Sequence, residues 1–139
     1  MGEKDILQNS KSLLIVKKIF IEEMSFKREN EIEGVIRFSN TCIGKTIKKL
    51  NDDKYKCSLS LNMSDSSESA KLKIIVSGIF EFNLGFDDEQ KESIITKNTM
   101  AILFPYLRAQ ITIMTSQPDV EPVVLPAINI NALLKNMDN

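Results

Sequence analysis

The sequence predicts an α+β fold in which strands come first and helices last. Residues 55–63 alternate strictly between apolar and polar side chains, which is typical of a half-buried antiparallel strand. A serine-rich loop and a second alternating segment, residues 72–82, follow it. Beyond Phe86 the apolar residues take a helical spacing instead. At 139 residues the chain fits a single domain, 1–139, in which we expect residues 1–11 to be a flexible N-terminus.

The first predicted strand is long. Residues 12–27 are rich in β-branched and aromatic side chains, and the length of the segment leaves room for a β-bulge. Regular alternation would place Phe20, Met24 and Phe26 on one face of this strand and Ile19 and Ile21 on the other. Both faces would then have apolar side chains to bury.

A second, shorter strand is predicted around Gly34, Ile36 and Phe38, which alternate with the residues between them. Residues 41–53 contain three lysines and end in Asn-Asp-Asp, with Lys54 directly after them, so we interpret them as a connection that closes in a turn. The lysines there could bind an anion, but a solvated loop is the simpler interpretation.

The last predicted strand, residues 72–82, carries an almost continuous apolar face. Its members are Leu72, Ile74, Val76, Gly78, Phe80 and Phe82. Antiparallel strands with one strongly apolar face need a cover, so a helix or another subunit must pack on it.

Helices are predicted in the C-terminal half. Asp87 and Asp88 can cap a helix over residues 89–95, and Asn98 can cap a second one over residues 100–114. Pro105 lies within the second segment, where proline costs about 3 kcal/mol. The helix therefore either begins near Phe104 or bends at the proline.

An extended crossover and a short final helix complete the pattern. Three prolines between residues 118 and 126 exclude a helix there. Asn129 can then cap a helix over residues 130–136, with Lys135 favourably placed near its C-terminal end.

The composition argues against catalysis. The chain has no histidine, so the usual hydrolytic triads and the commonest general base are missing, and no glycine-rich phosphate loop occurs. Cys42 and Cys57 form no metal-binding motif, so we expect no metal and no cofactor. A net charge of −1 gives no global attraction for nucleic acid, and we expect neither a nucleic-acid partner nor membrane insertion. With no secretory leader evident, a cytoplasmic location is expected.

The distinctive feature is an excess of apolar side chains on the strands. This set exceeds what the predicted helices would obviously cover: Phe20, Met24, Phe26, Phe38, Phe80 and Phe82. Any one of them could simply be core, but the set favours an oligomer interface or a partner groove.

Two C-terminal motifs resemble the SecB export-chaperone family. LFPYLR at residues 103–108 is similar to the family's LFPYAR helix, and LPAININAL at residues 125–133 is similar to its crossover and helix cap, in the same order and at about the same separation. The resemblance extends over roughly residues 13–135. It implies a four-stranded antiparallel sheet followed by a long helix, an extended crossover and a short C-terminal helix, with the proline near the start of the long helix and two dimers joined as a homotetramer.

The activity implied by the resemblance is that of a holdase. Family members hold unfolded polypeptides or preproteins, without ATP, in apolar grooves between sheet, crossover and second helix. Residue by residue, the resemblance predicts a client groove lined by Gly34, Ile36, Phe38, Val123, Val124, Leu125 and Ile128, with Phe20, Met24, Phe26 and Tyr55 as looser candidates. It predicts an oligomer interface formed by Leu72, Ile74, Val76, Leu103, Tyr106, Leu107 and Ile111.

The predicted partners follow from the same resemblance, with one departure. Export members dock the SecA motor on acidic sheet positions, whereas Lys27, Lys71 and Lys73 occupy the predicted strands here. This weakens the expectation of hand-over from this chain to SecA. SecB-like proteins also serve as dedicated chaperones of an antitoxin in toxin–antitoxin systems, and that alternative stays open beside export and general holding.

Overall fold

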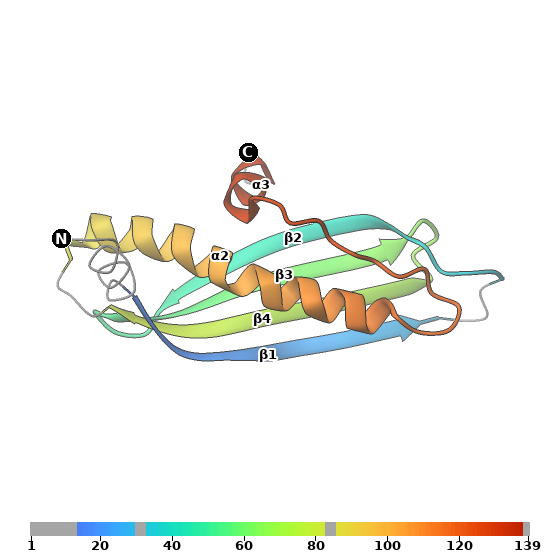
Figure 1. The fold of residues 1–139 in the computed structure, drawn as a ribbon, viewed down its shortest axis with the longest axis horizontal. Coiled ribbons are helices and arrows are strands. Elements are labelled where there is room, and N and C mark those ends of the chain that lie inside the picture. Colours follow the sequence, from blue (N-terminus) through green and yellow to red (C-terminus); the bar gives the residue numbers. More distant parts are fainter. Residues whose placement is uncertain (1–13, 30–32, 83–85, 138–139) are drawn as a thin grey trace, which may run out of the picture.

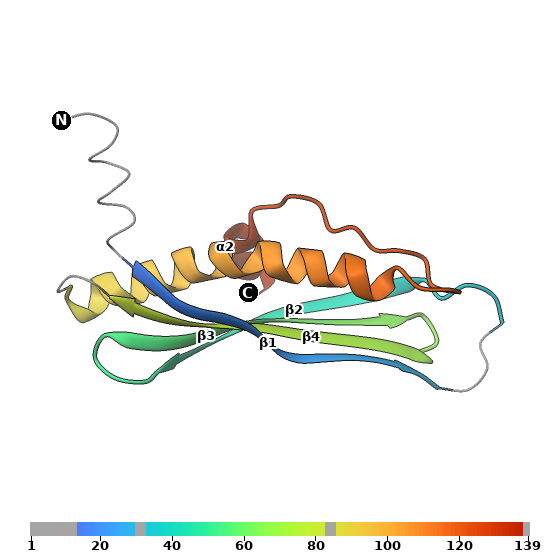
Figure 2. The same ribbon diagram turned by 60° about the horizontal axis from the view of Figure 1, so that its bottom comes forward.

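The fold is one antiparallel sheet covered on one face. The computed structural model describes residues 14–29, 33–82 and 86–137; the expected flexible N-terminus, residues 1–11, lies outside them. In these ranges the elements follow one another as β1 (Leu14–Arg28), β2 (Phe38–Lys49), β3 (Lys54–Asp65), β4 (Ala70–Phe82), α2 (Asp88–Thr115) and α3 (Ile130–Met137). The strand order is β1-β4-β3-β2, and Figures 1 and 2 show α2, the crossover and α3 on the same side of the sheet. The predicted α+β class and order of elements are confirmed.

Irregularities in β1 change which residues share a face. The register against β4 shifts between Val16 and Lys18 and again between Ile21 and Glu23, so the expected bulge is present twice. Because of the second shift, Met24 pairs with Ile74, on the same face as Ile21, whereas Phe20 pairs with Ser77 on the opposite face. The prediction that Phe20 shares a face with Met24 and Phe26 is therefore wrong.

β2 begins where the sequence predicted a strand to end. It covers Phe38–Lys49, so most of the expected connection is strand, and only the turn beyond it survives as predicted. Of the expected short strand, Ile36 makes one isolated parallel bridge, to Val120 in the crossover. Gly34 has φ +82°, a left-handed conformation that glycine adopts without strain.

The core lies between α2 and the apolar face of β3 and β4. The predicted alternation in both strands is confirmed, since their inward side chains are buried: Tyr55, Cys57, Leu59, Leu61, Met63, Leu72, Ile74, Val76, Phe80 and Phe82. The outward residues of the same strands are mostly lysine, serine and asparagine, and no described element covers them.

α2 is one helix of 28 residues rather than two. It starts as predicted at Asp87, whose carboxylate accepts from the Gln90 backbone N–H at 2.8 Å while the Gln90 side chain accepts from the Asp87 N–H. Asn98 is not a cap, because buried residues at helical spacing continue past it. Pro105 lies well inside the helix, so both the expectation of a start near Phe104 and the one that places this proline near the helix start are wrong.

α3 is positioned by its own cap. The Asn129 side chain accepts from the Ala132 backbone N–H at 3.2 Å, as predicted for a helix N-cap. Ile130 and Leu134 are buried and join the main core, which holds α3 beside α2 and β2. Both helices thus fix the ends of the crossover between them.

Candidate functional site

The crossover, residues 116–129, runs beside the C-terminal half of α2 and is bound to it through its backbone. Arg108 Nε donates to the Leu125 carbonyl at 2.6 Å, and the Val123 N–H donates to Thr115 Oγ1 at 2.8 Å. Thr112 Oγ1 also lies 3.3 Å from the Val123 carbonyl oxygen. These bonds satisfy polar groups of an extended segment that belongs to no sheet ladder.

The other end of the crossover is held by the segment that precedes β2. The Ile36 N–H donates to the Asp119 carbonyl at 2.8 Å, and the Glu121 N–H donates to the Ile36 carbonyl at 2.9 Å. Ile36 and Val120 are buried there in a small second core with Ala70. The crossover is therefore fixed at its start, in its middle and at the α3 cap.

With its backbone fixed, the crossover presents apolar side chains outward. Val124 is 66% exposed and Ile128 is 37% exposed. Ile128 lines a depression of about 290 Å³ between the crossover and α2, together with Phe104, Pro105 and Arg108. Such a space suits an apolar side chain, and Arg108 at its border offers charge to a polar one.

A second depression lies on the other side of α2, toward β1. It measures about 520 Å³ and is lined by Ile19, Ile21, Pro105, Tyr106 and neighbouring residues. Tyr106 is 49% exposed. Pro105 borders both depressions, so this part of α2 forms a ridge with an apolar hollow on each side.

The predicted groove residues divide into three groups. Val124, Ile128 and Met24 are exposed, the last by 54%, and Gly34 is exposed as well. Phe26, Phe38, Val123 and Leu125 are partly buried; the first two rings meet edge to face with centroids 5.9 Å apart. Ile36 and Tyr55 are buried in the subunit, which leaves them little surface for a client. Phe20 pairs with Ser77 on the opposite face of the sheet, yet it also borders the hollow beside Tyr106.

The predicted interface residues are mostly core. Leu72, Ile74, Val76, Leu103, Leu107 and Ile111 are buried between the sheet and α2 of one subunit. Their apolar area is already removed from water within the chain, so they have little surface left for contact with another subunit, and their assignment to an interface stays a prediction. Tyr106 alone of that set offers substantial surface.

Sequence reasoning missed the residues that fix the crossover. Arg108, Thr112 and Thr115 bind its backbone, whereas the sequence indicates Arg108 only as part of the LFPYLR motif. The available signal is the presence of hydroxyl and guanidinium groups in the mainly apolar second half of α2, because such groups need partners when partly buried.

The described residues offer neither a metal site nor a reactive buried thiol. Among them no group of three or more cysteine, aspartate or glutamate residues is placed to hold a metal ion. Burial raises the pKa of the Cys57 thiol to about 11, which keeps it protonated and unreactive at neutral pH. No helix in the described ranges combines the length and apolarity needed to cross a membrane. The candidate site thus consists of exposed apolar side chains beside two hollows.

Comparison with known proteins identifies the family. The family model described as preprotein translocase subunit SecB matches residues 7–139, and the chain belongs to the SecB family. Protein-export protein SecB of Orientia tsutsugamushi strain Boryong is 23% identical, with 94% of this chain and 87% of that protein covered. SecB of Saccharophagus degradans is 24% identical over 85% of this chain and 74% of its own length.

A solved structure agrees with the fold. The SecB-like chaperone of Mycobacterium tuberculosis, in complex with a ChAD peptide from the HigA1 antitoxin, superimposes with a TM-score of 0.67 at 11% identity. The match covers 91% of this chain and 99% of that chain. Together these likenesses confirm the expected family and the SecB-like fold. The protein is a SecB family chaperone.

Proposed function

We propose that this chain is an ATP-independent holdase whose client lies along the crossover and the hollows beside Pro105. The observation that carries the proposal is the exposure of Val124 and Ile128 on a segment whose backbone is already hydrogen-bonded to α2. An exposed apolar segment normally costs solubility and is kept where it binds something. A rigid one loses little entropy when it does so.

The mode of binding follows from the size of the hollows. Depressions of about 290 and 520 Å³ accept single side chains rather than a folded domain. An extended client would therefore place successive apolar residues in them while its intervening residues stay in water. Many weak contacts of this kind tolerate varied client sequences.

Substitution of Val124 provides a direct test. Val124→Asp removes apolar surface and adds a charge where the side chain is exposed, so the fold should be unaffected and the affinity for an unfolded client should fall about tenfold or more, as for 1.4 kcal/mol. Leu50→Asp, at an exposed residue of the β2–β3 turn, is the matched control. Equal affinity of the two variants for a permanently unfolded client would rule out the crossover as the binding surface.

We propose, in addition, a homo-oligomer arranged as two dimers, in the cytoplasm. The exposed Tyr106 and Ile113 of α2, and β1 and β2 as edge strands, support assembly. Mass measurement by light scattering is the test, and a monomer at micromolar concentration would contradict this proposal.

A dedicated chaperone of one antitoxin is the second candidate. The structural neighbour from Mycobacterium tuberculosis holds an antitoxin peptide, which favours this alternative. Capture from cells of origin separates the two: one abundant small partner supports the dedicated chaperone, whereas many nascent chains or preproteins support general holding or export. Recovery of SecA with the clients would support export.

A further inference from the structure

The uncovered face of the sheet carries lysines that oppose one another across neighbouring strands. Lys27 of β1 pairs in register with Lys71 of β4, and Lys48 of β2 pairs with Lys56 of β3. Like charges directly opposite on a sheet destabilise it. Two such pairs on one face therefore indicate that something other than folding stability keeps them there.

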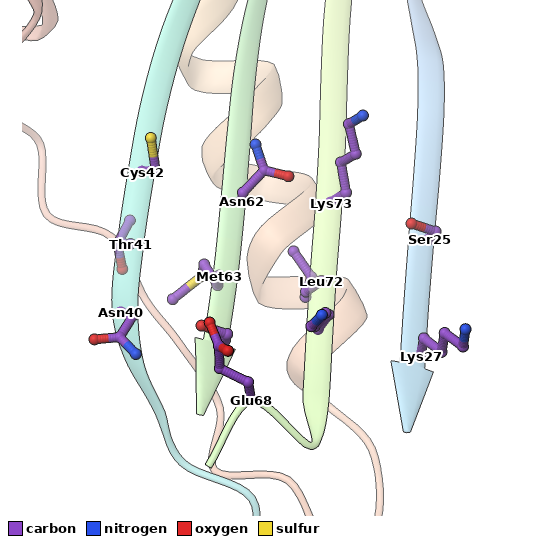
Figure 3. Close-up of a pocket in the computed structure, with 12 residues that line it drawn as sticks. Ser25, Lys27, Asn40, Thr41, Cys42, Asn62, Met63, Glu68, Leu72 and Lys73 are labelled. Carbon is purple, nitrogen blue, oxygen red and sulfur yellow. The ribbon is translucent and has the colours of Figure 1, made fainter. Parts of the chain in front are cut away.

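These lysines border a hollow surface. A depression of about 480 Å³ extends over the ends of β1, β4, β3 and β2, and a second of about 320 Å³ adjoins it, sharing Asn62 and Lys73. Five lysines and two glutamates line the two together. Figure 3 shows Lys73 of β4 next to Asn62 of β3, with Asn40 on β2 and Lys27 on β1 at the two edges of the sheet and α2 behind it.

Part of this charge is already neutralised within the chain. Lys56 is paired with Glu22, whose pKa is lowered chiefly by that hydrogen bond, and Lys73 lies 3.3 Å from Glu23. In the described residues, neither Lys48 nor Lys71 has a carboxylate within ion-pair distance, and Lys27 has only an exposed contact with Glu29 at 3.6 Å. In the described residues the unbalanced positive charge is thus at Lys71 and Lys48, and Lys27 is balanced only by its exposed contact with Glu29.

We propose that this open face of the sheet binds an acidic polypeptide segment, separately from any client on the crossover. A carboxylate placed between Lys27 and Lys71 would relieve their repulsion. Amide and hydroxyl side chains of Asn40, Asn62 and Ser25 can pair with the backbone of an extended segment. The side chains of such a segment repeat along one face about every 7 Å, a spacing that suits a surface made of strands.

The chemistry of the face disfavours nucleic acid. No aromatic side chain lines either depression, so bases would find no stacking surface. Phe20, on the same face, already has the ammonium groups of Lys18 and Lys56 at 5.2 and 5.9 Å from its ring centre. Glu22 and Glu68 lie among the lysines that line the two depressions. A continuous phosphate backbone could not avoid the two glutamates, whereas carboxylates spaced along a peptide can.

The experiment uses a labelled peptide of alternating Glu and Ser, about ten residues long, which spans roughly 33 Å when extended. Its affinity for the full chain is measured by fluorescence anisotropy at low and high salt, beside a Gln-Ser peptide. The variant Lys71→Glu/Lys73→Glu should weaken binding of the acidic peptide at least tenfold, and salt should weaken binding to the native chain. Lys49→Glu/Lys97→Glu, at exposed lysines off this face, makes the same change in net charge and should alter binding far less.

Equal loss in the two double variants, or equal binding of the Gln-Ser peptide, would overturn the proposal. So would binding of duplex DNA or of phosphatidylglycerol vesicles, lost in Lys71→Glu/Lys73→Glu, without binding of the acidic peptide. Lys71→Gln supplies a second measurement: it should raise the thermal unfolding midpoint, because the repulsion from Lys27 is gone, yet weaken the peptide complex. If Lys71→Gln lowered both the unfolding midpoint and the affinity for the peptide, Lys71 would be a residue that stabilises the fold, and the proposal would be contradicted. Client holding should persist in all of these variants.

Discussion

The ammonium group of Lys91, near the start of α2, lies 3.1 Å from a carboxylate oxygen of Asp53 and donates to the Asp52 carbonyl at 2.7 Å. Lys91 is buried, so these contacts fix the beginning of the long helix on the β2–β3 turn. The pKa of Lys91 is raised, chiefly by the hydrogen bond to Asp53, against the opposing effect of burial.

This pair predicts the behaviour of the protein in alkali. A lysine whose pKa is raised by folding contributes its stability fully below the ordinary lysine pKa of about 10.4, and the contribution disappears as pH rises through the folded-state value. The native chain should therefore lose stability above about pH 10 more steeply than Lys91→Met does. Urea unfolding between neutral pH and about pH 11 measures this. Lys97→Met, an exposed residue of the same helix, should keep the native slope, and identical slopes in all three proteins would refute the assignment.

The close packing around Gly78 predicts that a single added methyl group lowers the stability of the protein. A Cβ there would lie 2.7 Å from Phe80 Cε2 and 3.3 Å from Leu103 Cδ2, and both of these side chains are fully buried. Gly78→Ala should lower the free energy of unfolding by about 1–3 kcal/mol. At Gly44 the nearest contact is the Ser60 hydroxyl, which can turn away, so Gly44→Ala should cost less than about 1 kcal/mol. Equal midpoints in chemical denaturation would contradict this account.

Replacing Pro105 is expected to raise the free energy of unfolding, whereas replacing Gly78 lowers it. Pro105 has no N–H to donate to the Ala101 carbonyl, one turn earlier in α2. Pro105→Ala should raise the free energy of unfolding, by up to about 3 kcal/mol, while the change at the ridge between the two hollows weakens client binding. Ala109 is exposed on the same helix, and Ala109→Gly should lower the free energy of unfolding by about 1 kcal/mol. That result would confirm that helix propensity affects stability in this part of α2. A destabilised Pro105→Ala would mean that α2 requires the proline.

The two cysteines should differ in reactivity. Cys42 is exposed, whereas Cys57 is buried with its pKa raised to about 11. Thiol titration of the native protein near pH 8 should therefore show one fast thiol, and the second should react only on unfolding. Cys42→Ser should remove the fast phase. Two fast thiols in the native protein would show that β3 opens readily.

The fold was predictable where one face of an element is continuously apolar. β3 and β4 followed directly from alternation, and the caps at Asp87 and Asn129 from residue type. β2 was missed because few of its residues are buried, and Ile43 alone is well covered; its pairing with β3 stabilises a lysine-rich segment that has little strand pattern of its own.

The candidate site was predictable only in part. Val124 and Ile128 were expected in the groove, and the structure exposes them, but their use by a client stays a prediction. A shift of one residue in β1 moved Phe20 to the opposite face, and no periodicity in the sequence locates such a shift. The long-range bond from Arg108 to the Leu125 carbonyl likewise depends on tertiary packing.

The most direct test of the holdase is suppression of aggregation. A chemically denatured client is diluted into buffer containing the native chain, without ATP, and light scattering is followed at increasing ratios of chaperone to client. We predict that scattering falls to near the baseline at a stoichiometric amount of oligomer, and that Val124→Asp shifts the required amount upward while Leu50→Asp does not. Unchanged scattering with excess native protein would contradict the account.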